Sequence, residues 1–168
     1  MTINKYPNIL ETTIKIKFKD RDLLENVFIH RSYLNEHKSS SLPSNERLEF
    51  LGDSVLSLIT SVYLFKNYPN LKEGDYTEIK SAIVKMDSLA EAAKKINLNN
   101  YLLLSKGEEK GAGRTNNNIL ADCFEALIAA IFLDQNFEAA YLFVVNFLFK
   151  DKLDYLLMLP SRTLSVLI

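Results

Sequence analysis

Cysteine, glycine, proline and tryptophan are scarce in this sequence of 168 residues. Its single cysteine, Cys123, cannot form a disulfide within the chain, which excludes a small disulfide-stapled secreted fold. Five glycines and four prolines are too few turn-forming residues for a sandwich or barrel of many short strands. Hydrophobic residues make up 48% of the chain, so enough apolar surface is present to offset the entropy of ordering and a disordered chain is excluded.

The sequence also lacks long hydrophobic runs and an excess of either charge. No uninterrupted apolar run approaches the roughly 20 residues that a bilayer span needs, and the first ten residues, MTINKYPNIL, lack the apolar core of a signal peptide. We therefore expect a cytoplasmic protein with no membrane partner. The 20 basic and 21 acidic side chains give a formal net charge of −1, whereas a domain that binds nucleic acid by neutralising phosphates is usually basic.

Apolar residues recur with the period of a helix along almost the whole chain, which predicts an all-α fold with a single domain over residues 1–158. Loops are expected at 37–44 and 105–118, and Ser88 and Glu91 have the spacing of a capping box. The last ten residues, 159–168, do not continue the pattern; they are a tail folded onto the domain or a truncated linker. Helices are expected near the N-terminus as far as Ile16, from Asp20 to Ile29, and over 46–65, 75–85, 87–96, 118–133 and 137–158.

Three acidic residues share one face of the helix predicted for residues 46–65. With about 100° of turn per residue, Glu49 and Asp53 both fall within about 60° of Glu46. Such a face is ordinarily just solvated, and this alternative stays open on the pattern alone. The opposite side carries the residues expected to face the core, namely Leu48, Leu51, Val55, Leu58 and Val62.

Phe50 does not fit a purely solvated face. It falls about 40° from Glu46, beside the acids and away from the apolar stripe. A large ring exposed next to charged groups more often marks a contact with another surface. A second subunit is the simplest candidate, because small soluble oligomers are mostly symmetric dimers; the alternative is that Phe50 packs under a loop of its own chain.

The segment 119–133, ILADCFEALIAAIFL, contains thirteen apolar residues and two acids, Asp122 and Glu125. A helix that is apolar all round is a buried helix, and a buried carboxylate without a partner is costly. Two acids three residues apart on one face therefore need either a basic side chain or a metal ion as a partner.

Acids from these two helices can converge into a cluster that contains no histidine or thiolate. Oxygen-only ligand sets favour hard cations such as Mg²⁺ or Mn²⁺, and paired cations of this kind support phosphodiester hydrolysis. A di-iron bundle needs Glu-x-x-His pairs, which the two histidines do not form. No Gly-rich nucleotide loop of the known types occurs, so no organic cofactor is expected.

Five stretches of the chain, taken together and in order, resemble one family. They are HRS at 30–32, NERLEFLGDSVL at 45–56, EGD at 73–75, KGEEKGAGR at 106–114 and ILADCFEAL at 119–127. The chain resembles the endonuclease domain of the ribonuclease III family, of the bacterial type, over roughly residues 5–158. Departures are Glu78 where many relatives carry a basic residue, Ala112 in place of a common glycine, and Asn118 in place of a serine.

The resemblance implies a helical nuclease domain that works as a symmetric homodimer, with Phe50 at the dimer interface. His30 also matches a family position, where a structural role is the expectation. Lys106 and Arg114 match a loop that approaches RNA, although ordinary surface charge remains an alternative for both. The implied catalytic residues are a metal-binding quartet, Glu49, Asp53, Asp122 and Glu125, and two outer acids, Glu46 and Glu73.

The activity that the resemblance implies is Mg²⁺-dependent cleavage of both strands of double-stranded RNA, with Mn²⁺ as a substitute metal. It leaves 5′-phosphate and 3′-hydroxyl ends and serves RNA processing, including that of ribosomal RNA. We expect no double-stranded-RNA-binding domain within these residues, which accounts for the balanced charge if most RNA affinity is supplied elsewhere. The alternatives are a catalytically inactive RNA-binding or ribosome-associated protein on the same fold, and a dimerisation module of a larger complex.

Overall fold

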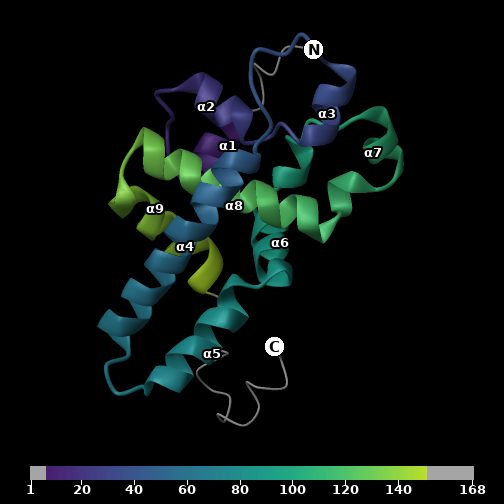
Figure 1. Cartoon of the computed structure of the whole chain (residues 1–168). Coiled ribbons are helices and arrows are strands. Elements are labelled where there is room, and N and C mark those ends of the chain that lie inside the picture. The colour runs from purple at the N-terminus through teal and green to yellow at the C-terminus, as the bar shows by residue number, and fades with distance from the viewer. Residues whose placement is uncertain (1–6, 151–168) are drawn as a thin grey trace.

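The computed structural model describes residues 7–150, and this part of the chain is helical, with no strand among the described residues. The all-α prediction is confirmed. Two short 3-10 helices, η2 (Leu98–Asn100) and η3 (Gly113–Thr115), join longer elements, and a π-helix, η4 (Val145–Phe149), follows the last α-helix. The α-helices, shown in Figure 1, are α1 (Pro7–Ile14), α2 (Arg21–Asn26), α3 (Arg31–Glu36), α4 (Glu46–Asn67), α5 (Glu73–Val84), α6 (Met86–Lys95), α7 (Lys106–Lys110), α8 (Asn117–Asp134) and α9 (Phe137–Val144).

Helix α8 forms the centre of the core, as its apolar sequence predicts. It crosses behind α4 in the view of Figure 1, and it packs most extensively against α4 and then against α6. Its small residues let these neighbours approach closely, because an alanine adds little width to a helix. Cys123 is fully buried in α8, and burial raises the pKa of its thiol, so it is an inert packing residue. The small residues of α8 that are buried are Ala121, Ala126, Ala129 and Ala130.

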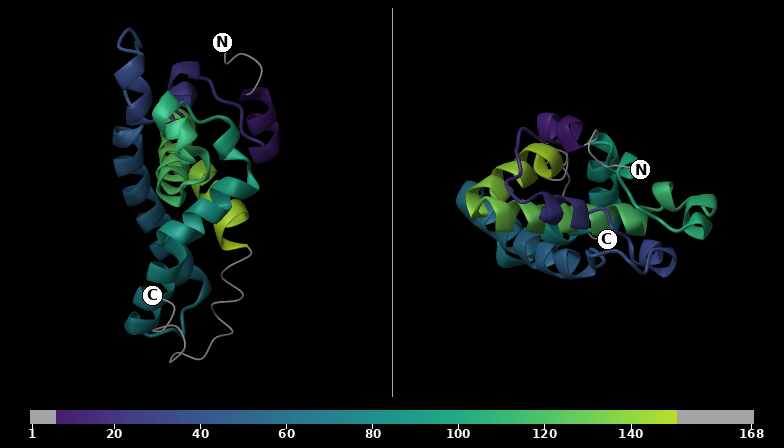
Figure 2. Two further views of the ribbon diagram at one scale, coloured as in Figure 1. Left: turned by 90° about the vertical axis from the view of Figure 1, so that its right-hand side faces the viewer. Right: turned by 90° about the horizontal axis from the view of Figure 1, so that it is seen from above.

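Helices α4 and α5 together form an arm that extends beyond the rest of the domain (Figures 1 and 2). Helix α4 has 22 residues, about 33 Å at 1.5 Å per residue, and only part of that length can cross α8. Its far half packs against α5 instead. The arm therefore carries its own exposed surface, away from the core.

The buried face of α4 differs from the predicted stripe. Leu58 was expected in the core but is 54% exposed, whereas Leu56 and Ile59 are fully buried. The reason is that α8 and α5 cover α4 from one side, which rotates the buried face toward Leu56 and Ile59. By length and composition alone α4 could cross a membrane, but core helices pass the same test.

Two local features differ from the sequence-based prediction: a short helix replaces part of a predicted loop, and one helix begins at a different residue. Helix α7 lies within the predicted loop 105–118, because the Ser105 hydroxyl accepts a hydrogen bond from the Glu108 N–H and caps its first turn. The predicted capping box at Ser88 is wrong: α6 begins at Met86, and the buried Ser88 hydroxyl donates to the Ala82 carbonyl oxygen. The predicted end of the last helix at 158 and the tail 159–168 lie outside the described residues.

Candidate metal centre

The close crossing of α4 and α8 builds the site. At the crossing, Gly52 of α4 lies directly against the backbone of Glu125 on α8, with no room for a side chain. One turn before Gly52, Glu49 projects from α4 toward α8. Because Asp122 and Glu125 are three residues apart, both project from the same face of α8 toward α4.

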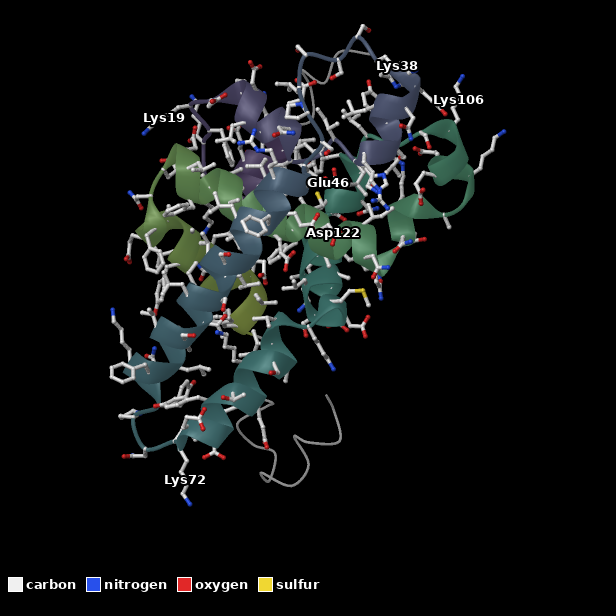
Figure 3. The ribbon with its side chains drawn as sticks, in the orientation of Figure 1. Lys19, Lys38, Glu46, Lys72, Lys106 and Asp122 are labelled. Carbon is white, nitrogen blue, oxygen red and sulfur yellow. The ribbon has the colours of Figure 1, made fainter. Side chains whose placement is uncertain are left out.

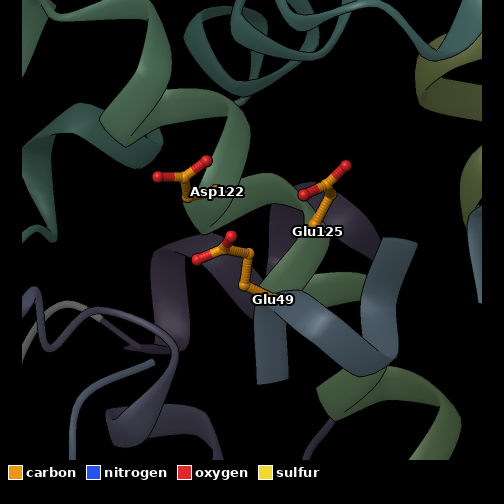
Figure 4. A group of neighbouring side chains, drawn as sticks. All are labelled: Glu49, Asp122 and Glu125. Atoms are coloured by element: carbon orange, nitrogen blue, oxygen red, sulfur yellow. The ribbon is translucent and has the colours of Figure 1, made fainter. Parts of the chain in front are cut away.

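Three carboxylates from these two helices meet. Glu49, Asp122 and Glu125 each offer one oxygen, and these oxygens all lie within 4.8 Å of one another. Figure 4 shows the three side chains converging from the two helices. The remaining residue of the predicted quartet, Asp53, is exposed and not part of this group, but its charge acts on Glu125.

Burial and mutual repulsion make the charged forms of these acids costly. Burial first, and then the charges of Asp53, Asp122 and Glu49, raise the pKa of Glu125 to about 8. Burial and the neighbouring carboxylates of Asp122 and Glu46 also raise the pKa of Glu49. Burial raises the pKa of Asp122, and the basic side chains of His30 and Arg31 only partly oppose this rise.

The charge balance of the group fits a divalent cation. Within residues 7–150, none of the carboxylates of Glu49, Asp122 and Glu125 takes part in a hydrogen bond or an ion pair. Like charges held together without a counterion are expected to protonate or to bind a cation. Three carboxylates on two rigid helices, with no thiolate or imidazole in the group, are a ligand set for a hard cation such as Mg²⁺ or Mn²⁺.

A polar cavity of about 320 Å³ adjoins the group on the side of α3 and α7. Glu49 and Asp122 form one wall, and Glu46 lines the same cavity, where its carboxylate accepts a hydrogen bond from the Ser44 hydroxyl and lies 3.8 Å from Arg31. Sequence reasoning missed several residues of this cavity, although most of them lie in or next to the family-like segments. These residues are Arg31, Asn45, Glu108, Asn116 and Asn118.

Glu73 lies away from this centre within one chain. It is the first residue of α5, exposed, and its carboxylate accepts a hydrogen bond from the Thr77 hydroxyl. The preceding residue, Lys72, is at the far end of the arm in Figure 3, well separated from the labelled Glu46 and Asp122. Within one chain, Glu73 is therefore not brought to the acidic group.

The two predicted RNA-binding residues differ in their surroundings. The Arg114 guanidinium pairs with the Glu109 carboxylate through Nε and Nη2, and its Nη1 donates to the Asn99 carbonyl oxygen at 2.7 Å. Its donors are thus used to hold the loop between α7 and α8 against η2. Lys106 has an exposed side chain that projects outward at the edge of the molecule, near Lys38 in Figure 3.

The fold and the acidic group define an all-α domain with a carboxylate centre between two crossed helices. The chain belongs to the ribonuclease-III-like family, whose family model matches residues 20–152. It is 49% identical to Ribonuclease 3 of Enterococcus faecalis, over 84% of this chain and 64% of that protein, and 48% identical to Ribonuclease 3 of Chloroflexus aurantiacus, over 82% and 57%. The chain thus spans about three fifths of the length of these curated relatives.

The fold is similar to that of solved nuclease domains. The nuclease domain of ribonuclease III from Campylobacter jejuni is 36% identical, with a TM-score of 0.80, over 88% of this chain and 97% of that one. A second structure of the same domain has a TM-score of 0.79 and is described as flexible in a region involved in dimer formation. This chain therefore has the fold of the nuclease domain of the family.

Proposed function

We propose that this chain is an Mg²⁺-dependent endoribonuclease that hydrolyses both strands of double-stranded RNA in RNA processing. The observation that carries the proposal is the meeting of Glu49, Asp122 and Glu125 between α4 and α8, inside the fold of a family of nucleases. A site of this kind favours phosphodiester chemistry, because it presents negative charge that a divalent cation must balance before an anionic substrate can approach.

The chain's own residues define how the cation would be held. Glu49, Asp122 and Glu125 would hold Mg²⁺, or Mn²⁺ in its place, and Asp53 would join them from the next turn of α4. The bound cation supplies positive charge that activates water and stabilises the leaving oxygen. Glu125 must lose its proton to act as a ligand, so its pKa of about 8 couples cation binding to the release of that proton.

Cleavage of both strands requires two sites, which we propose are supplied by a homodimer built on α4. Phe50 is 79% exposed near the start of α4 and Phe65 is 74% exposed near its far end, so α4 presents large apolar side chains to solvent. An apolar groove of about 600 Å³ lies between α5 and the far half of α4, with Phe65 and Tyr76 in its wall. A symmetric pairing of such faces buries these rings, and it is also the arrangement in which Glu73 could reach the other chain's site.

RNA contacts of this chain are proposed at the exposed edge that carries Lys106. Arg114 is a weaker candidate, because its donors are already bound to Glu109 and Asn99. The formal charge of −1 predicts weak binding by this chain, with a shallow dependence on salt. The expected products carry 5′-phosphate and 3′-hydroxyl ends.

The direct test compares the wild-type chain with the Glu125→Gln variant on duplex RNA, with and without Mg²⁺. The carboxamide keeps the shape of the side chain but removes its charge, so we expect normal folding and loss of at least 100-fold in cleavage rate, or roughly 3 kcal/mol. Glu138→Gln, on the exposed face of α9, is the matched control and should cleave normally.

Two results would contradict the proposal. Cleavage that is retained in Glu125→Gln would show that the acidic group is not the active centre. Duplex RNA that is bound but not cut by the wild-type chain at any Mg²⁺ or Mn²⁺ concentration would favour the alternative of an inactive RNA-binding protein.

A further inference from the structure

His30 lies in the wall of the cavity beside the acidic group. Two hydrogen bonds from Ser32 hold its ring, and a third, from Ser105, holds the Ser32 hydroxyl. The Ser105 N–H donates to the Ser32 hydroxyl oxygen at 3.0 Å. The Ser32 hydroxyl lies 2.8 Å from His30 Nδ1, and the Ser32 N–H donates to the same nitrogen at 3.3 Å. His30 is thereby the N-cap of α3.

These contacts determine which ring nitrogen carries the proton. The Ser32 oxygen accepts from a backbone N–H, so its own hydroxyl proton is available for His30 Nδ1. Nδ1 therefore accepts from two donors and has no proton of its own. The proton of the neutral His30 ring is therefore on Nε2, the other ring nitrogen. The His30 side chain lines the cavity.

The second histidine of the chain has the opposite arrangement. His37 Nδ1 lies 3.0 Å from the Tyr33 carbonyl oxygen, which can only accept a hydrogen bond. The His37 ring must therefore carry its proton on Nδ1. Each histidine therefore serves as an internal reference for the other, because the two rings should carry their protons on different nitrogens.

Carboxylates surround the His30 ring. Burial lowers the pKa of His30, and the positive charge of Arg31 lowers it too. The negative charges of Glu108, Asp122 and Glu46 act to raise it. Asp122 is the one of these acids that also belongs to the group of three. Both His30 and Asp122 line the cavity, and within residues 7–150 no hydrogen bond orients the Asp122 carboxylate, so that none reaches it from His30 Nε2 in the metal-free structure.

We propose that His30 is a positioning residue for the cation site: when a cation binds, the His30 Nε2–H donates to the Asp122 carboxylate across the cavity that both residues line and fixes the orientation in which that carboxylate binds the cation. The inference rests on the metal-dependent function proposed above and goes beyond it, because it gives this helix cap a second role. Groups that hydrogen-bond to ligating carboxylates are worth about 10–100-fold in metal affinity or activity.

Two substitutions separate the cap from the positioning role. In His30→Asn, the amide oxygen occupies nearly the place of Nδ1 and still caps α3, since asparagine is a good N-cap residue, but no donor reaches the place of Nε2. In His30→Gln, the amide nitrogen reaches nearly the place of Nε2. His37→Gln, outside the cavity, is the control.

The first measurement is the ring tautomer, read from the nitrogen chemical shifts of the two histidines in the metal-free wild-type protein at a pH where both are neutral. His37→Gln assigns the two sets of signals. We expect a protonated Nε2 for His30 and a protonated Nδ1 for His37. A His30 ring protonated on Nδ1 would overturn the proposal, whatever the activity of the protein.

The second measurement is the affinity for Mn²⁺ alone, by calorimetry. We expect His30→Asn to keep the thermal unfolding midpoint of the wild type and to bind Mn²⁺ about 10–100-fold more weakly, and His30→Gln to recover most of the affinity. Equal affinities of His30→Asn and the wild type would overturn the proposal, and so would an equal loss in both variants. If the wild type itself binds no Mn²⁺, the proposed function fails instead, while the tautomer still reports on His30.

The acid that receives the hydrogen bond is tested with Glu108→Gln. If His30 acts through Asp122, the effects of His30→Asn and Glu108→Gln on Mn²⁺ affinity should multiply in the double variant. A double variant no weaker than His30→Asn alone would assign the donor to Glu108 and overturn the inference.

Discussion

The backbone carbonyl oxygen of Glu125 lies 1.9 Å from the point that a Cβ atom on Gly52 would occupy. No real Cβ atom tolerates such a contact, so α4 and α8 can touch here only because residue 52 has no side chain. Glu49 and Asp53 flank this glycine on α4, and Glu125 itself provides the backbone on the other side. The contact thus sets the distance between the acids of the two helices.

A methyl group at residue 52 should therefore act on the site as well as on the fold. We expect Gly52→Ala to lower the free energy of unfolding by about 1–3 kcal/mol through overpacking and to weaken Mn²⁺ binding, because α4 must move away from α8. Thermal unfolding and calorimetric titration with Mn²⁺ measure the two effects. Gly74→Ala on α5, where a Cβ meets nothing within 4 Å, is the matched control and should be neutral or slightly stabilising. A Gly52→Ala variant as stable as the wild type would contradict the close contact.

The metal-free protein should lose stability as the pH rises from about 5 to 8. Glu125 has a pKa of about 8 when folded and an ordinary value of 4.5 when unfolded, so the folded state binds the extra proton in this window. The contribution of Glu125 to stability is therefore fully present below pH 4.5 and is lost as the pH rises through the folded pKa. Solvent screening reduces the total for this partly exposed group to about 2 kcal/mol.

Urea unfolding in the presence of a chelator, at pH 5, 6.5 and 8, measures this slope. Glu125→Gln should flatten it and be more stable than the wild type at pH 8, since the repulsion among the acids is relieved. Saturating Mg²⁺ should stabilise the wild type most at pH 8, where the largest fraction of Glu125 in the series, about half, is already deprotonated. A wild-type slope of the opposite sign would show that Glu125 titrates normally.

The residues that determine the fold were more visible in the sequence than the distances at the site. The period of apolar residues predicted all-α structure, and the two acids of ILADCFEAL could be assigned to one face because they lie within one helix. The crossing of α4 and α8 depends on the whole core, so the pattern could not show that Glu49 joins Asp122 and Glu125 while Asp53 lies outside the group. Leu58 was predicted to lie in the core because it belongs to the apolar stripe of α4. The prediction was wrong because the spacing of apolar residues does not show which side of the helix its neighbours cover.

Arg114 and Lys106 should respond differently to loss of charge. Arg114→Gln removes hydrogen bonds to Glu109 and Asn99, and we expect about 1 kcal/mol of destabilisation, because this ion pair is partly exposed. Lys106→Gln should leave stability unchanged and lower the slope of log affinity against log salt by about one, if Lys106 contacts a phosphate. Filter binding of duplex RNA over a salt series, with Ca²⁺ or chelator to prevent cleavage, measures the slopes. An unchanged slope in Lys106→Gln would remove this residue from the RNA contacts.

Phe50 is expected to hold two chains together without contributing to the core of either. Its ring is 79% exposed, beside the acidic face of α4, and the neighbouring arm exposes Leu58 and Phe65. Because the same face meets itself in a symmetric dimer, one Phe50→Ala substitution removes two rings, and we expect dimer affinity to fall by at least 100-fold. Sedimentation measures the dissociation constant, and the unfolding midpoint of the isolated chain should barely change. Leu133→Ala, an exposed apolar residue on α8, is the control. A wild-type chain that stays monomeric at high concentration would exclude this dimer, and with it the cutting of both strands by paired sites.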